Sequence, residues 1–142
     1  MAFDDDALEL LSGRHVGVLG TVLATGAPGL ACVWYGFDGD DLIVATPAGR
    51  RKDKNVRSDE RVSLLVDASD HADPPGGYRG VEVRGSATIE DDPEGQLRRQ
   101  IVGRYLDPIP ADFQERINAE ERRIIRIRPA RVRVWDFARG RR

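Results

Sequence analysis

The chain has 142 residues, 40% of them hydrophobic and 32% charged, and this length and composition are typical of one globular domain with a single core. Its formal net charge of −2 argues against nucleic acid as a partner, and its single cysteine, Cys32, excludes an intramolecular disulfide and favours a reducing cytoplasm. The acidic N-terminal segment and the lack of any run of 18 apolar residues indicate neither a signal peptide nor a membrane-spanning helix, so we expect one soluble domain over residues 1–142.

The first half of the chain predicts one helix followed by a series of strands. Residues 4–12 favour a short helix, because an aspartate at its start can cap it and Leu8 and Leu11 share one face. Beyond it, apolar and β-branched residues interrupted by glycine-rich turns are typical of buried strands. These strands are expected over residues 15–23, 30–37, 42–46 and 61–66, with a basic helix over residues 50–58.

The second half predicts a loop, more strands and two helices. Residues 67–77 hold two prolines and two glycines and suit a loop, whereas strict alternation over residues 81–89 predicts a strand buried on one face. Leu97, Ile101 and Tyr105 recur every four residues and predict a helix that begins at Pro93. The remaining expected elements are a helix over residues 111–122 and strands over residues 124–128 and 131–135.

This order of many short strands with a few peripheral helices differs from the regular alternation of strands and helices in a parallel sheet. We therefore predict a mainly β (α+β) fold with an antiparallel sheet of six to seven strands and one core.

The sequence shows no recognisable nucleophile or metal cluster. His15 opens a predicted strand and His71 lies in a polar loop, so a structural or solvent-exposed role is favoured for both. No group of His, Cys or carboxylate residues has ligand spacing, and no metal is expected. Catalytic residues are therefore left unassigned.

A basic segment at the end of a predicted strand is the first candidate for ligand binding. Thr46 ends the strand, and Arg50, Arg51 and Lys52 lead into the predicted helix. In this hypothesis a hydroxyl, free backbone amides and three cations converge on one anion, since helix N-termini and forked arginines both bind phosphate. A solvated helix face explains the same charges, but the strand-end position favours phosphate.

Two adjacent aromatic residues, Trp34 and Tyr35, lie in the neighbouring predicted strand. Adjacent strand residues point to opposite faces, so only one of them can line a given pocket. Either ring is compatible with core packing or with a flat wall for a fused tricyclic ligand.

These landmarks resemble the pyridoxamine-5′-phosphate-oxidase-like superfamily of flavin and deazaflavin proteins, in particular the branch that uses coenzyme F420. The resemblance covers about residues 12–90, and residues 91–142 match only in order and length. The matching segments are Arg14–Thr21, Gly26–Pro28, Val33–Tyr35, Thr46, Gly49, Arg50, Lys52, Asn55, Asp59–Leu64 and Val81–Gly85.

The resemblance implies a homodimeric split β-barrel with two cofactor sites at the subunit interface. Positions matching Arg50, Lys52 and Asn55 hold the cofactor phosphate, and Tyr78 approaches the ring from the partner chain. The implied cofactor-binding residues are Val33, Trp34, Tyr35, Thr46, Arg50, Arg51, Lys52, Asn55 and Tyr78.

The function that the resemblance implies is an F420-dependent oxidoreductase, which passes hydride from the reduced coenzyme to a conjugated or quinone-like small molecule. The hydride chemistry belongs to the cofactor, so the lack of an acid–base pair does not argue against an enzyme. The alternatives are an FMN-binding protein of the same superfamily and a non-catalytic protein that binds a flavin, a deazaflavin or a tetrapyrrole.

The C-terminal region is rich in arginine, with nine arginines and one acidic residue in residues 122–142. Arg126, Arg128, Arg131 and Arg133 alternate with isoleucine or valine, so we expect them on a solvated sheet face. Binding of the acidic tail of F420 is the alternative role for these arginines.

Overall fold

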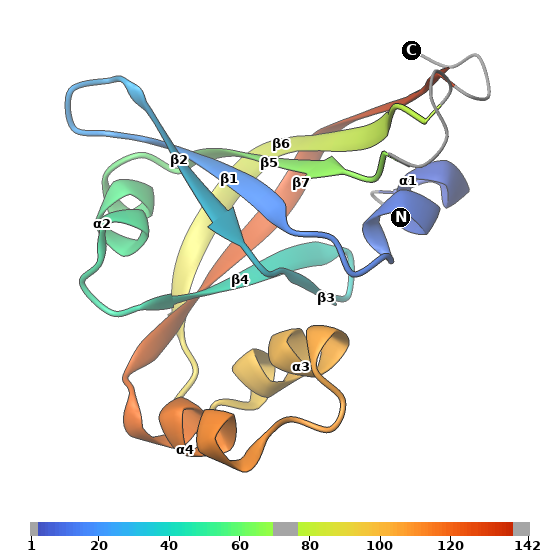
Figure 1. Cartoon of the computed structure of the whole chain (residues 1–142). Coiled ribbons are helices and arrows are strands. Elements are labelled where there is room, and N and C mark those ends of the chain that lie inside the picture. Colours follow the sequence, from blue (N-terminus) through green and yellow to red (C-terminus); the bar gives the residue numbers. More distant parts are fainter. Residues whose placement is uncertain (1–2, 70–76, 138–142) are drawn as a thin grey trace.

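The computed structural model describes residues 3–69 and 77–137, so most of the predicted loop, including His71, lies outside the described residues. Within these ranges, seven strands form one antiparallel sheet in the order β2-β1-β5-β6-β7-β4-β3, with four helices around it (Figure 1). The prediction of a mainly β fold with an antiparallel sheet of six to seven strands is confirmed, and the sheet is consistent with a split barrel.

The bounds of the elements agree with most of the predicted ranges. The strands are β1 (Gly17–Val22), β2 (Pro28–Val33), β3 (Gly36–Asp38), β4 (Asp41–Pro47), β5 (Arg61–Asp67), β6 (Arg79–Asp91) and β7 (Arg122–Asp136). The helices are α1 (Asp5–Leu11), α2 (Arg51–Ser58), α3 (Gln96–Tyr105) and α4 (Ala111–Ala119).

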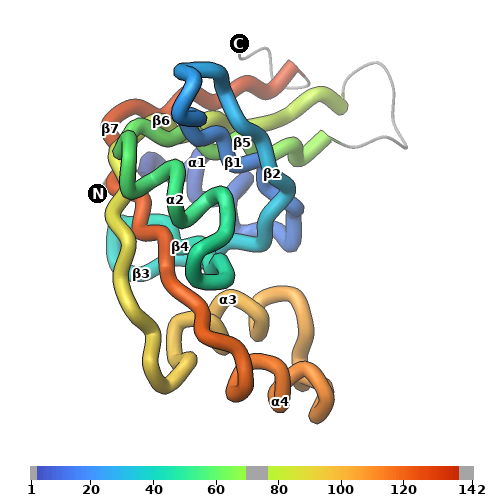
Figure 2. The backbone as a smooth tube through the Cα atoms, turned by 90° about the vertical axis from the view of Figure 1, so that its left-hand side faces the viewer, coloured from blue at the N-terminus to red at the C-terminus, as the bar shows by residue number. Residues whose placement is uncertain are grey.

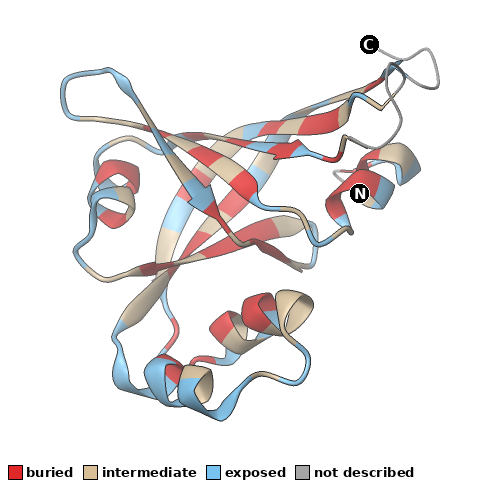
Figure 3. Ribbon diagram, viewed as in Figure 1, coloured by how far each residue is buried: buried red, intermediate tan, exposed pale blue. Residues whose placement is uncertain are grey.

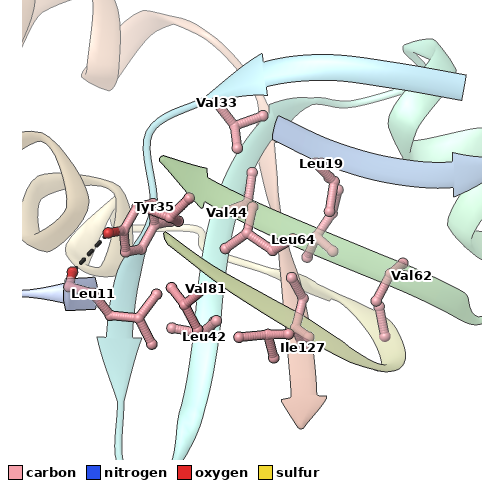
Figure 4. Close-up of a cluster of buried hydrophobic side chains, with 14 of the residues drawn as sticks. Leu11, Leu19, Val33, Tyr35, Leu42, Val44, Val62, Leu64, Val81 and Ile127 are labelled. Atoms are coloured by element: carbon pink, nitrogen blue, oxygen red, sulfur yellow. Dashed lines mark hydrogen bonds between the residues drawn. The ribbon is translucent and has the colours of Figure 1, made fainter. Parts of the chain in front are cut away.

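The main core lies inside the curled sheet and is closed at one end by α1 (Figures 3 and 4). Asp4 caps α1 by accepting a hydrogen bond from the Ala7 amide at 2.8 Å, and Leu11 at the end of this helix is fully buried. Tyr35 is also fully buried, and its hydroxyl donates to the Leu11 carbonyl oxygen at 2.6 Å. Burial raises the pKa of Tyr35 to about 12, so this contact is made by a neutral phenol.

A second, smaller cluster of buried residues joins α3 to the sheet, where the sequence predicted one core only. Ile101 of α3 packs there with Ile43 of β4 and Ile124 of β7. Helices α3 and α4 lie together at one end of the molecule in two perpendicular views (Figures 1 and 2). They form a lobe inserted between β6 and β7, which we call the α3–α4 lobe (residues 96–119).

Two predicted strand assignments are wrong. The strand expected over residues 30–37 is two strands, β2 and β3, because the backbone leaves the sheet at Trp34 and Tyr35. The Tyr35 amide donates to the Tyr105 hydroxyl at 3.3 Å, and the Tyr35 carbonyl accepts from Arg104, so α3 takes the backbone hydrogen bonds that a neighbouring strand would make.

The two strands expected over residues 124–128 and 131–135 are one continuous strand, β7. Strand β6 pairs with it from Arg123 to Asp136, and a register shift between Arg84 and Gly85 leaves Ala130 out of the pairing. Gly85 passes so close to the Arg128 carbonyl oxygen that a Cβ at this position would collide with it.

The solvated position expected for Arg126 is also wrong, whereas Arg128, Arg131 and Arg133 are exposed as expected. The Arg126 side chain is only 16% exposed and contacts three carboxylates. The distances from its guanidinium nitrogens to Asp38, Asp41 and Glu90 are 2.7, 3.1 and 2.8 Å. These hydrogen bonds raise its pKa and tie β3 and β4 to β6 and β7.

Candidate functional site

A pocket of about 300 Å³ lies where the ends of β2 and β4 and the start of β7 meet the α3–α4 lobe. This volume is at the small end of the range for ligand sites. Its lining combines apolar and aromatic side chains with four cations and one acid. The lining residues are Cys32, Val33, Trp34, Ala45, Pro47, Lys52, Arg98, Ile101, Val102, Phe113, Arg116, Ile117, Glu120 and Arg122.

The aromatic part of the wall is Trp34, at the point where the chain leaves β2. Its ring stacks on Tyr105 with centroids 4.6 Å apart and an interplanar angle of 7°. Phe113 of α4 lies nearly parallel to it at 6.2 Å. The Tyr105 hydroxyl donates to the His15 carbonyl oxygen at 2.8 Å, which fixes α3 against the start of the sheet. Trp34 is therefore packed against one aromatic ring from each helix of the lobe.

Four cations line the pocket against one acid. Lys52, Arg98, Arg116 and Arg122 carry the positive charges, and Glu120 is paired with Arg122 at 2.7 Å. Burial, then Arg122 and Arg50, lower the pKa of Lys52. Like charges held this close disfavour one another, so the pocket gains from an anionic ligand.

Arg98 is the most deeply buried of these cations, with a side chain only 6% exposed. Its Nη1 donates to the Glu120 carbonyl oxygen at 2.7 Å, but its buried Nε has no hydrogen-bond partner among the described residues and lies 3.7 Å from an Asp92 oxygen. The same Asp92 carboxylate accepts the amides of Leu97 and Arg98 at the start of α3. Asp92 thus caps the helix and positions Arg98 at once.

The segment between β4 and α2 brings Lys52 to the pocket. Gly49 adopts a φ of +77°, which allows the tight turn after Pro47. The buried Asp53 carboxylate accepts the Gly49 amide at 2.7 Å and the Arg57 Nε at 2.7 Å. Since Asp53 already occupies that amide, the predicted set of free backbone amides is smaller than the sequence suggested.

The structure brings together only some of the residues predicted for the site. Val33, Trp34 and Lys52 line the pocket, whereas Arg50 and Arg51 are exposed at the start of α2. Two further predicted residues are buried away from it.

Those two residues are Thr46, which is fully buried in β4, and Asn55, whose amide donates to the Thr21 hydroxyl at 3.0 Å. Tyr35 lies in the main core with its hydroxyl paired, so Trp34 is the aromatic residue that faces the pocket. The predicted convergence of the Thr46 hydroxyl with the three cations is wrong for this structure, because alternate residues of β4 face opposite sides.

Tyr78 lies far from this pocket within the same chain. It precedes β6 and is 64% exposed, with its ring edge-on to Phe137. The thirteen-residue β6 separates it from the lobe, which corresponds to roughly 40 Å of strand. A role for Tyr78 at a cofactor therefore requires a second chain.

Sequence reasoning missed Arg98, Phe113, Arg116 and Arg122. Arg122 reaches the pocket because it pairs with Pro47 in the β4–β7 ladder, and the other three come from the folded-back lobe. The signals present in the sequence were the Asp92 cap and the aromatic residue on α4, but neither places a side chain beside Lys52.

The donor set fits a planar ligand that carries an anionic group: a flat aromatic wall, clustered cations and one unsatisfied buried guanidinium nitrogen. Over residues 3–69 and 77–137, no group of three or more His, Cys, Asp or Glu residues is arranged to hold a metal ion. No helix in the same ranges is long and apolar enough to cross a membrane.

The chain is similar to several known proteins in sequence and fold. A family model described as pyridoxamine 5′-phosphate oxidase matches residues 3–136. The conserved hypothetical protein Rv2991 from Mycobacterium tuberculosis is 26% identical, with a TM-score of 0.80 over 95% of this chain and 86% of that chain. A structure named F420 reductase is 30% identical, with a TM-score of 0.72 over 92% and 98%. A heme-binding protein from Mycobacterium smegmatis, 22% identical with a TM-score of 0.72 over 92% and 52%, shares the fold.

Proposed function

We propose that this chain, which belongs to the pyridoxamine 5′-phosphate oxidase family, is a reductase that uses coenzyme F420 and acts on a conjugated or quinone-like small molecule. The observation that carries the proposal is the pocket that joins the stacked Trp34 to the cations at the start of α2 and β7. The similarity to a protein named F420 reductase, at 30% identity over 98% of that chain, supports the deazaflavin over FMN.

In this proposal the chain's own residues bind and orient the cofactor. Lys52 and Arg122 hold its phosphate inside the pocket, and Arg50, whose charge acts on Lys52, adds positive charge from the exposed start of α2. Val33 and Trp34 support the ring, and the apolar side chains of α3 exclude water. When bound, the reduced deazaflavin would supply the hydride chemistry, two electrons with one proton, and water would supply the second proton of the reduction.

We also propose that the protein is a homodimer, paired through the outer face of β2, β1 and β5. Val18 pairs with Cys32 and with Leu65 in the ladders, so these three side chains share one face with Leu30, and Leu30 is 75% exposed. Cys32 also lines the pocket, so a second copy on this face would reach the edge of the site. Sedimentation of a Leu30→Glu variant as a monomer, where the unmodified protein sediments as a dimer, is the expected result.

The test of the cofactor proposal is a pair of fluorescence titrations with F420 and with FMN, followed by turnover with the reduced form of whichever binds. We expect F420 to bind at one site per chain and to reduce members of a panel of quinones and conjugated carbonyl compounds. Tight binding of FMN without binding of F420 contradicts the cofactor assignment, and binding without turnover on the whole panel contradicts the reductase.

Matched variants of α2 test the phosphate site. The double variant Arg50→Ala, Lys52→Ala is expected to bind F420 at least tenfold more weakly, because each charge-assisted hydrogen bond contributes about 1.5–3 kcal/mol. Lys54 has the same charge on the same helix but is exposed and does not line the pocket, so Lys54→Ala is the control. Equal losses in both proteins would indicate a diffuse charge effect instead of a site.

A further inference from the structure

The part of the pocket formed by the α3–α4 lobe carries positive charge that a single phosphate at Lys52 does not use. We propose that Arg98 and Arg116 form a carboxylate subsite for the acceptor, so that the substrates are planar conjugated carboxylates. This inference rests on the proposed function, because it assigns the substrate class of the same site.

Arg98 is the first part of the argument. Arg98 lines the pocket with a side chain only 6% exposed, and its buried Nε, 3.7 Å from an Asp92 oxygen, makes no hydrogen bond in the described part of the chain. An unsatisfied donor in such a position is costly, so native proteins rarely retain one without a ligand or a water. Burial is also the main cause that lowers the pKa of Arg98, and a bound anion removes part of that penalty.

Arg116 is the second part. Its guanidinium lies 4.8 Å from the centroid of the Phe113 ring, and both residues line the pocket. Within residues 3–69 and 77–137, Arg116 takes part in no ion pair, unlike Arg122, which is bound to Glu120. A guanidinium stacked on an aromatic ring is oriented in advance and keeps its edge free for hydrogen bonding.

The surroundings decide the class of anion. Ile101, Val102 and Ile117 line the same pocket as these arginines, so a ligand that fits this side is apolar except at its charged group. The fork of a guanidinium matches the two oxygens of a carboxylate. A flat apolar body with one carboxylate therefore fits this side, while the phosphate of the cofactor fits the side formed by Lys52.

Binding of 2-naphthoate and of its neutral analogue 2-naphthamide tests the subsite without any cofactor. Trp34 reports occupancy through its fluorescence in a Trp135→Phe background, since the chain has two tryptophans and Trp135 lies at the far end of β7. We expect the carboxylate to bind about tenfold more tightly than the amide. Equal affinities for the two compounds overturn the proposal.

The variant Arg116→Gln, at an exposed position, is expected to remove this preference by weakening naphthoate about tenfold and leaving naphthamide unchanged. Arg128→Gln, an exposed arginine of β7 outside the pocket, is the control and should behave as the unmodified protein. Arg98→Gln gives a second reading where circular dichroism shows that it folds. An unchanged preference in Arg116→Gln overturns the subsite.

The carboxylate could also come from the acidic tail of the coenzyme, and titration of Arg116→Gln with F420 distinguishes this source. Unchanged F420 affinity together with weakened naphthoate supports the acceptor subsite. Weakened F420 with unchanged naphthoate overturns it in favour of the tail. If the unmodified protein binds neither F420 nor FMN but still prefers naphthoate, the proposed function fails and the carboxylate subsite stands.

Discussion

Replacement of Lys52 by methionine is expected to weaken the phosphate-bearing cofactor and, at the same time, to stabilise the ligand-free protein. Methionine keeps an unbranched apolar stem in the pocket and removes the charge. The loss of one charge-assisted hydrogen bond, about 1.5–3 kcal/mol, corresponds to an affinity about 10- to 150-fold lower. Stability changes in the opposite direction, because burial and the charges of Arg122 and Arg50 lower the pKa of Lys52 and so disfavour its charged form in the folded protein.

The pH dependence follows from the same direction of shift. A lysine with a lowered pKa binds fewer protons in the folded than in the unfolded chain, so its unfavourable contribution is largest at neutral pH and fades as pH rises toward the ordinary lysine value of 10.5. The stability gain of Lys52→Met over the unmodified protein should therefore shrink with rising pH. Cofactor affinity of the unmodified protein should fall over that range, and Lys52→Arg, which stays charged, should not show the fall.

Thermal unfolding without ligand and cofactor titration between neutral and alkaline pH measure both effects in the same preparations. Lys54→Met on the exposed side of α2 controls for loss of a positive charge. A variant Lys52→Met that binds the cofactor as tightly as the unmodified protein, or one that unfolds at a lower temperature, would refute the assignment of Lys52 to an anion site built from mutually repelling cations.

Three further predictions concern the framework that holds the site. Arg126→Met should lower the free energy of unfolding by about 1–3 kcal/mol, because three partly exposed ion pairs of up to about 1 kcal/mol each are lost. Urea denaturation should show that this loss is smaller at high salt, and that the control variant Arg128→Met loses almost no stability. One of the three tyrosines should ionise only near pH 12 in an absorbance titration, and Tyr35→Phe should abolish that late step. The contribution of the neutral Tyr35 phenol to stability is complete below pH 10 and is lost as pH rises through 12. Tyr105→Leu should shift the fluorescence of Trp34 and weaken the cofactor, whereas Tyr105→Phe, which keeps the stacked ring, should preserve the spectrum.

The sequence predicted the elements of the barrel well because its signals are local. The alternation over residues 81–89 and the capped helix at Asp4 each depend on neighbours a few residues away, and both agree with the structure. The assignment of Trp34 and Tyr35 to a continuous strand failed for the opposite reason. Tyr105 and Arg104, about seventy residues further along, supply the hydrogen bonds that end β2 at this point.

Only the side of the site formed by Lys52 was predicted, because the other side depends on contacts between residues far apart in the sequence. Lys52 follows a strand end and a glycine turn, and both features are visible in the sequence. Arg122 stands beside it only because β7 pairs with β4, and Arg98 and Arg116 reach it only because the lobe folds back. The alternation of arginines in the sequence does not distinguish Arg128, which is exposed to water, from Arg126, which contacts three carboxylates.

The way the lobe is attached separates the residues that α4 contributes to the pocket from the residues that hold the sheet together. Strands β6 and β7 pair with each other up to the point where the lobe is inserted, and α3 packs on the sheet through Ile101 of the second cluster. Helix α4 buries a single residue, Ile117, yet it contributes Phe113 and Arg116 to the pocket. Because substitutions at its exposed positions remove little buried apolar surface, we expect the residues that α4 contributes to the pocket to tolerate substitution without loss of the sheet that positions Lys52.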